Sequence, residues 1–204
     1  MTVFEPFLFP SFGLIGCLLA VLYSLAIPLL LCFRYEGRYS FSPKEKGFMV
    51  LLSLFFMIVG TLWAKGPIPL PVWAFLAYHF MTDLKYMELS NGVNLWIAGL
   101  SVFSLLPAWL EAGFWGSGVP TAIVLFLVMI LMGCLGPLGG GDIKMMTALG
   151  LYFTLWEIPG LLFYGCLIGS VQGLYLILVK RVSRHASFAF GPSLILGTLI
   201  TVCC

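Results

Sequence analysis

The sequence predicts an all-α polytopic membrane protein with about eight membrane-crossing or membrane-embedded helices. Of its 204 residues, 61% are hydrophobic and only 9% are charged, a composition far outside the range of soluble proteins. The apolar residues form long runs separated by short polar loops, as expected for helices that cross a bilayer. Neither a Ser- or Gly-rich linker nor a repeat of about 20–50 residues divides the chain, so residues 1–204 are expected to form one membrane-embedded domain.

Two apolar runs, residues 11–33 and 48–64, predict the first two helices. Pro28 lies inside the first run, where neighbouring helices can tolerate a kink. The residues before this run lack the basic region of a cleavable signal peptide, so the run is expected to remain in the protein. The polar segment 34–47 between the two runs is rich in Lys and Arg.

The third apolar run, residues 71–82, is unusually short for a transmembrane helix. At about 1.5 Å per residue it extends only about 18 Å, whereas the hydrocarbon core of a bilayer is about 30 Å thick. Asp83 is therefore expected below the membrane surface; alternatively, the proline-rich segment 67–71 dips into the membrane. Five further helices are expected at residues 93–109, 120–135, 142–156, 159–179 and 191–204.

The basic residues predict the orientation of these helices. If the chain changes sides at every helix, nine of the ten Lys and Arg residues fall on one side and only Lys65 falls on the other. Loops rich in Lys and Arg stay in the cytoplasm. The side with nine basic residues, which also carries both aspartates, is therefore expected to face the cytoplasm, with both chain ends outside.

Asp83 and Asp142 are the only aspartates among the eight acidic residues, and each lies at the end of an apolar run. An ionisable group at that depth is costly and by default indicates a functional site with a partner. Three glycines, residues 139–141, precede Asp142 and leave the backbone open to close approach by another helix or polypeptide. As an alternative, Asp142 is an ordinary cap at the start of the next helix.

Two carboxyl groups that approach each other predict aspartyl catalysis. Like charges at short distance cannot both ionise, so such a pair shares one proton. The ionised carboxylate then activates water, and the protonated carboxyl group donates to the carbonyl oxygen of the scissile bond. No metal or cofactor is expected, since none of the six cysteines has C-x-x-C spacing and His79 and His185 lie in unrelated segments.

The region around these aspartates resembles the type IV prepilin peptidase family. Gly139, Gly141 and Asp142 resemble its GxGD signature. Asp83, followed by the sequence Leu-Ser-Asn at residues 89–91, is similar to the first catalytic segment of the family, with a serine at position 90 in place of the usual proline.

A third resemblance lies at residues 188–192, which are similar to the Pro-Phe-Gly-Pro sequence that opens the last helix in this family. The first proline of that sequence is missing here. Together the three segments extend the resemblance over about residues 71–204.

The resemblance implies an integral-membrane aspartic endopeptidase that removes the short basic leader of type IV prepilins or pseudopilins at the cytoplasmic face of the prokaryotic inner membrane. Its substrates, which serve type IV pili or type II secretion, carry a hydrophobic stem helix after the leader, and no nucleic acid takes part. Asp83 and Asp142 match the two catalytic aspartates of the family. The further residues that support the motifs are Gly139, Gly141, Lys144 and Lys85.

The cysteine pattern bears on a second activity of the family. Many members also methylate the new N-terminus, and these members carry a cytoplasmic loop with two C-x-x-C pairs. The cysteines at 17, 32, 134, 166, 203 and 204 do not form such pairs. The resemblance therefore predicts leader cleavage without methylation.

Other readings of the same residues remain open. A small proton-coupled carrier would bind and release protons at the two aspartates, and a scaffold protein would use neither for chemistry. Lys85 and Lys144 either tune the aspartates or extend from the helix ends toward the membrane surface. Gly165, Gly169 and Gly173, spaced four residues apart, predict close packing of one helix against another.

Overall fold

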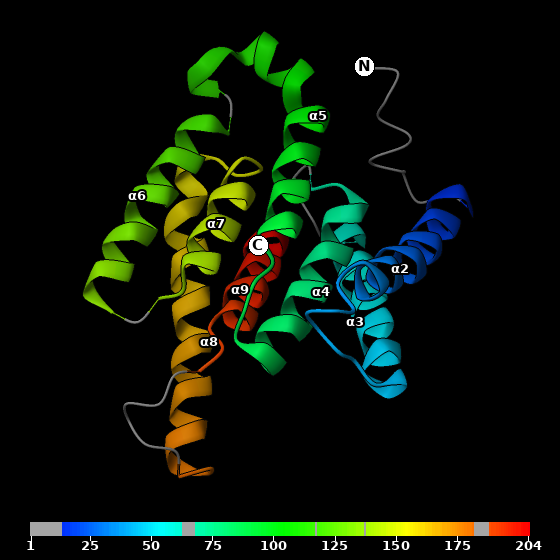
Figure 1. The fold of residues 1–204 in the computed structure, drawn as a ribbon. Coiled ribbons are helices and arrows are strands. Elements are labelled where there is room, and N and C mark those ends of the chain that lie inside the picture. The colour runs from blue at the N-terminus through cyan, green and yellow to red at the C-terminus, as the bar shows by residue number, and fades with distance from the viewer. Residues whose placement is uncertain (1–13, 63–67, 117, 137, 182–187) are drawn as a thin grey trace.

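The computed structural model of the protein describes residues 14–62, 68–116, 118–136, 138–181 and 188–204 (Figure 1). The described part consists of helices and the turns between them and contains no strand. This confirms the predicted all-α class. Lys65, the one basic residue expected on the opposite side, lies outside the described residues, as do Arg184 and His185.

Each of the eight segments that were expected to be helical contains one α-helix. The helices, in chain order with one short 3₁₀ turn labelled η1, are α2 (Leu14–Arg34), α3 (Pro43–Leu62), α4 (Leu70–Tyr86), α5 (Asn91–Gly116), α6 (Val119–Leu135), α7 (Gly140–Gly150), η1 (Leu155–Glu157), α8 (Ile158–Leu178) and α9 (Gly191–Cys203). Their boundaries differ from the expected ones in two places that matter for the site, the end of α4 and the segment 142–156.

Two helical stretches within the described residues are long and apolar enough to cross a membrane, Gly16–Arg34 and Leu155–Leu178. The apolar helices Asn91–Pro107, Val119–Leu135 and Gly191–Cys203 are shorter. Large apolar side chains such as Phe33, Leu51 and Leu110 are nevertheless exposed on the outer faces of the bundle. An exposed apolar surface of this kind suits contact with lipid, and the crossing of the bilayer by all eight helices stays a prediction.

Helix α4 is the central element of the fold. It contacts α2, α3, α5 and α9, and nearly all of its side chains from Leu70 to Asp83 are buried. On the α3 side, a Cβ atom added to Gly60 would lie 2.4 Å from Cε2 of Trp73, so the indole ring packs directly on the α3 backbone. A carboxyl group on α4 is therefore held by the core rather than by a surface loop.

The end of α4 differs from the sequence prediction. The short run 71–82 was expected to end before Asp83, but the helix continues to Tyr86 and places Asp83 in its last turns. It ends because Met87 adopts the left-handed conformation, with φ 52°, and donates its N–H to the carbonyl oxygen of Asp83. The charged residues Asp83 and Lys85 did not stop the helix, since Lys85 near its C-terminus is favourable for the helix dipole.

The segment 142–156 was expected to form one helix, and this prediction is wrong. Helix α7 ends at Gly150, where an added Cβ atom would lie 2.9 Å from Cα of Ala122 on α6. A new helical segment then begins at η1, because Thr154 and Glu157 form a capping box there. The chain therefore changes direction soon after α7, which stays short and lies beside α6.

The predicted close packing of the glycines on α8 is confirmed for its central part. A Cβ atom added to Gly197 of α9 would lie 2.5 Å from the backbone nitrogen of Gly165, so the two helix backbones touch. Gly169 is buried against the ring of Phe190, whereas Gly173 makes only ordinary contacts. The α8–α9 pair positions the turn that precedes α9 next to the end of α4 (Figure 1).

Candidate active site

The carboxyl groups of Asp83 and Asp142 meet at the start of α9. A Cβ atom added to Gly191 would lie 2.7 Å from Oδ2 of Asp83 and 3.3 Å from Oδ1 of Asp142. The two carboxyl oxygens therefore flank a single point above the Gly191 backbone, although they come from α4 and α7. Both side chains are buried, with exposed fractions of 5% and 7%.

The two carboxyl groups have different partners. The backbone N–H of Gly191 donates a buried 2.8 Å hydrogen bond to Oδ2 of Asp83, and a hydrogen bond of this kind stabilises the ionised form. The Asp142 carboxyl group has a hydrogen bond with the backbone of Gly139, but its Oδ1 atom is buried without a partner. A buried acceptor that lacks a partner requires an explanation, and a shared proton or a substrate would supply one.

The glycines before Asp142 differ in what surrounds them. A Cβ atom at Gly141 would lie 2.8 Å from Cβ of Leu89, and one at Gly139 would lie 3.1 Å from Oδ2 of Asp142. A Cβ atom at Gly140 would have nothing within 4 Å. Gly139 and Gly141 therefore allow close contacts that a side chain would block. The backbone at Gly140 makes no close contact of this kind, so a side chain would fit there.

The segment after α4 packs against the first turn of α7. Leu89 faces Gly141, and Asn91 accepts a 3.0 Å hydrogen bond from Nζ of Lys144. Ser90, which replaces the usual proline, is buried at the start of α5, and its carbonyl oxygen accepts the backbone N–H of Asn94 at 3.1 Å. The two sequence segments that resemble the prepilin peptidase motifs are thus brought together.

Lys85 and Lys144 bind groups other than the aspartates. Nζ of Lys85 donates to the carbonyl oxygen of Ser40 at 2.9 Å and to Glu45 at 2.8 Å, and it lies over the rings of Phe41 and Tyr86. The hydrogen bond from Lys85 lowers the pKa of Glu45 to about 2. Lys85 thus links the end of α4 to residues 40–45, and Lys144 links the start of α7 to the start of α5.

The turn that carries Gly191 is clamped by one side chain of α8. Nε2 of Gln172 donates to the carbonyl oxygen of Ala189 at 3.0 Å, and Oε1 accepts from Oγ of Ser193 at 2.8 Å. Because these two partners flank Gly191 in sequence, Gln172 fixes the backbone on both sides of the N–H that reaches Asp83. Pro192 at the first positions of α9 further restricts this turn.

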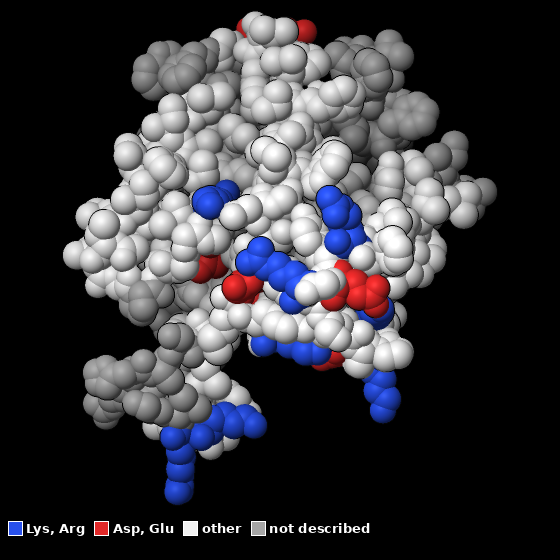
Figure 2. All heavy atoms as spheres, viewed as in Figure 1, with Lys and Arg blue, Asp and Glu red and all other residues white. Residues whose placement is uncertain are grey.

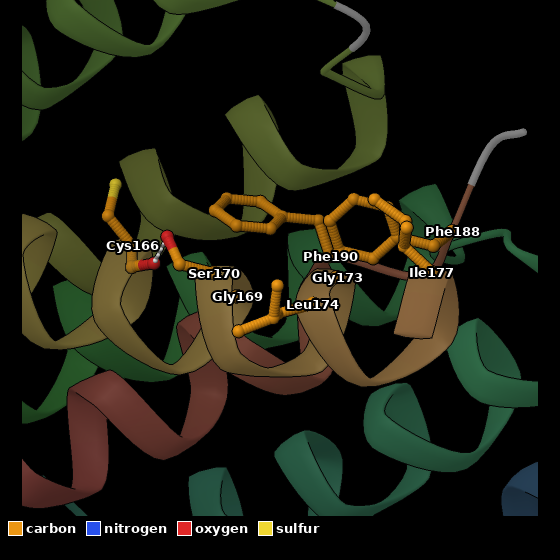
Figure 3. A pocket seen from close by; sticks show the side chains of 8 residues that line it. All are labelled: Cys166, Gly169, Ser170, Gly173, Leu174, Ile177, Phe188 and Phe190. Atoms are coloured by element: carbon orange, nitrogen blue, oxygen red, sulfur yellow. Dashed lines mark hydrogen bonds between the residues drawn. The ribbon is translucent and has the colours of Figure 1, made fainter. Parts of the chain in front are cut away.

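An apolar groove with a volume of about 440 Å³ lies along α8 beside the same turn (Figure 3). Phe188 and Phe190 form one wall, and Gly169 and Gly173 lie on the α8 side. At Gly169 an added Cβ atom would lie 2.4 Å from Cε2 of Phe190, so this ring packs on the helix backbone. The packing of Phe190 helps to hold the neighbouring Gly191 in place.

Charged side chains gather at the end of the molecule where these segments meet. Figure 2 shows the Lys and Arg side chains over the middle and lower part of one face, with acidic side chains among them. Among the described residues, Arg38 pairs with Glu88 at 3.0 Å and Lys85 pairs with Glu45 at 2.8 Å. The buried aspartates therefore lie near the end of the molecule that carries most of the Lys and Arg side chains seen in this view.

Two residues of the site were not predicted from the sequence. Gly191 was noted only as part of a similar helix start, although a glycine before Pro192 at the start of a helix has an N–H free for a ligand or side chain. The second residue is Asn94 on α5, which donates a hydrogen bond to the carbonyl oxygen of Gly141. No sequence pattern indicated this contact, because a single asparagine in an apolar helix does not show which group it will face. Among the described residues, no group of three His, Cys, Asp or Glu side chains could hold a metal ion.

Comparison with known proteins identifies the family. Residues 70–174, slightly more than half of the chain, match the model of the type IV leader peptidase family. The chain is 27% identical over 124 residues to the prepilin leader peptidase/N-methyltransferase of Bacillus subtilis, covering 59% of this chain and 48% of the relative. It is 31% identical over 145 residues to the protein of the same name from Neisseria gonorrhoeae, covering 71% and 42%.

A third relative, the prepilin leader peptidase/N-methyltransferase of Legionella pneumophila, is 26% identical over 138 residues, covering 65% of this chain and 48% of the relative. The chain thus spans about half the length of the curated relatives it matches. No solved structure gives a significant match. The matched region contains Asp83, Asp142 and the glycines at residues 139–141, and the chain belongs to the type IV leader peptidase family.

Proposed function

We propose that this protein is a membrane aspartic endopeptidase that removes the short basic leader from type IV prepilins or pseudopilins. Asp83 and Asp142 form the catalytic dyad. The observation that carries the proposal is the position of their carboxyl oxygens, 2.7 Å and 3.3 Å from one point above Gly191. The family membership and the names of the relatives support the peptidase activity and the prepilin substrate.

The different surroundings of the two carboxyl groups support separate roles. Both carboxyl groups accept a backbone N–H, but only Asp142 has a buried oxygen without a partner, so Asp83 is assigned the negative charge and acts as the general base that removes a proton from water. Asp142 carries the shared proton, because its buried Oδ1 lacks a partner and two adjacent negative charges repel each other. Its O–H donates to the carbonyl oxygen of the scissile peptide as water attacks the carbon.

The proposal also includes an orientation in the membrane. The site faces the cytoplasm, where the polar ends of α4, α5 and α7 lie together with the basic side chains. A leader rich in Lys and Arg would remain at this polar surface, while the hydrophobic stem of the substrate would stay in the bilayer. The comparisons give no support to the alternative of a proton-coupled carrier.

Cleavage of a prepilin by the purified protein tests the proposal. A substrate with a basic leader and an apolar stem should be cut once before the stem, as mass spectrometry of the products would show. Asp83→Asn and Asp142→Asn should each nearly abolish cleavage, and the double variant should lose little more, because the two residues act as one unit.

The asparagine substitutions separate catalysis from helix capping. Asn caps a helix about as well as Asp, so a capping role for Asp142 would survive the change. Glu111→Gln, at an exposed acidic residue of α5, serves as the matched control and should cleave normally. Substantial cleavage by a folded Asp83→Asn or Asp142→Asn protein would rule out the aspartyl mechanism. If the unchanged protein left the substrate intact, the peptidase assignment itself would be wrong.

A further inference from the structure

A buried chain of polar groups connects the two helices that carry the aspartates. Nε2 of His79 lies 2.9 Å from Oδ1 of Asn94, and Nδ2 of Asn94 donates to the carbonyl oxygen of Gly141 at 3.3 Å. His79 lies on α4 one turn before Asp83, and Gly141 directly precedes Asp142. Asn94 of α5 therefore bridges from the Asp83 helix to the backbone next to Asp142.

The hydrogen-bonding capacities fix the direction of this chain. A peptide carbonyl only accepts, so the amide nitrogen of Asn94 has to face Gly141. The amide oxygen then faces His79 and requires a proton on Nε2 of the imidazole. The second nitrogen, Nδ1, is buried and has no hydrogen-bond partner, so the ring is assigned the neutral form, in which Nδ1 carries no proton.

These groups lie where polar side chains are costly. His79 is fully buried and Asn94 is 5% exposed. Buried polar groups lose their contacts with water, so they are maintained only if their hydrogen bonds are made in one arrangement. An apolar pair would fill the same space without that requirement, but it would not fix the distance between α4 and the first turn of α7.

We propose that His79 and Asn94 are positioning residues for the aspartate pair. The two hydrogen bonds, from His79 to Asn94 and from Asn94 to the Gly141 carbonyl group, form a polar bridge, called the strut below. The strut sets the position of Asp142 relative to Asp83. Neither side chain contacts the substrate, and neither exchanges a proton during the reaction. The role rests on the proposed peptidase function, because it concerns the geometry of that dyad.

If the strut positions the aspartates, its loss should lower kcat and leave KM nearly unchanged. His79→Leu and Asn94→Leu should lower kcat for prepilin cleavage by about 10- to 100-fold with KM changed less than about twofold, since misplacement by about 1 Å has effects of that size. The double variant should be close to the single ones, because either change breaks the same strut. Losses that multiply, or a rise in KM alone, would overturn the proposal.

Two conservative substitutions separate the strut from general packing. The amide nitrogen of Gln occupies about the place of Nε2 of His, whereas that of Asn occupies about the place of Nδ1. His79→Gln should therefore keep most of kcat, and His79→Asn should not. Thr198→Val, which removes a buried hydroxyl group bonded within α9, is the matched control and should cleave normally.

A distance measurement tests the strut independently of activity. Spin labels at Leu84→Cys and Gly140→Cys, both exposed positions, report the separation of α4 from α7 in a background without native cysteines. Asn94→Leu and His79→Leu should shift or broaden the distance distribution, while His79→Gln and Thr198→Val should leave it unchanged. An unchanged distribution in folded leucine variants would overturn the inference, and this result can be read even if the protein never cuts a prepilin.

Discussion

The backbone N–H of Gly191 donates a 2.8 Å hydrogen bond to the carboxyl group of Asp83 across 108 residues of chain. The same glycine lies against the carboxyl group of Asp142, where an added Cβ atom would come within 3.3 Å of Oδ1. The start of α9 thus touches both aspartates, and Gln172 holds the turn on either side of this contact. The relative position of the two aspartates therefore depends on α9 as well as on α4 and α7, which carry them.

Replacing Gly191 by Ala tests this contact. A methyl group would lie 2.7 Å from Oδ2 of Asp83 and would have to push the carboxyl groups apart. We expect cleavage to fall by at least about 100-fold, as displacements of about 1 Å in active sites can do. Gly173→Ala, whose added methyl group would meet only ordinary contacts at 3.9 Å and beyond, is the control. Normal cleavage by Gly191→Ala would mean that the aspartates do not work in this arrangement.

The three consecutive glycines before Asp142 should tolerate alanine unequally. Gly140→Ala should retain cleavage, since the added methyl group meets nothing within 4 Å. Gly141→Ala would clash with Leu89 at 2.8 Å and should lose most activity, and Gly139→Ala should lose part of it because its methyl group lies 3.1 Å from Oδ2 of Asp142. Cleavage rates of the three variants check this order, and equal losses at all three positions would contradict the site geometry.

Cysteine labelling tests the proposed orientation. In a background without native cysteines, Glu36→Cys in the turn after α2 should be protected from a membrane-impermeant reagent added to intact cells, because segment 34–47 is expected in the cytoplasm. Glu111→Cys, exposed near the far end of α5, should react. The reverse pattern would place the aspartates on the outer side and remove the basis for a cytoplasmic site. Residue His185 is expected to behave like Glu36.

The cysteine pattern makes a separate prediction about the product. We expect the new N-terminus of the cleaved substrate to remain a free amine when a methyl donor is present, because the chain has no paired C-x-x-C sequence. The relatives are named both as peptidases and as N-methyltransferases, so this expectation departs from their names. Mass spectrometry of the product decides it, and an added methyl group would show the prediction to be wrong.

The sequence by itself determined the helical class, the positions of most helices and the two acidic residues of interest. Long apolar runs of this length have few alternatives to helix in a bilayer, because every backbone polar group must be hydrogen-bonded internally. Asp83 and Asp142 stood out because carboxyl groups are rare and costly in such runs. The same local signals indicated the glycines before Asp142 and the family to which the chain belongs.

Only the tertiary structure decided which groups surround the aspartates. The continuation of α4 through Asp83 to Tyr86, and the end of α7 at Gly150, depend on a left-handed residue at Met87 and on the approach of α6 to α7. Gly191 contacts Asp83, and Asn94 contacts the carbonyl group of Gly141 next to Asp142, through packing between helices that lie far apart in sequence. Such contacts depend on how the helices pack, and the hydrophobic pattern of a single helix contains no information about the residue that faces it.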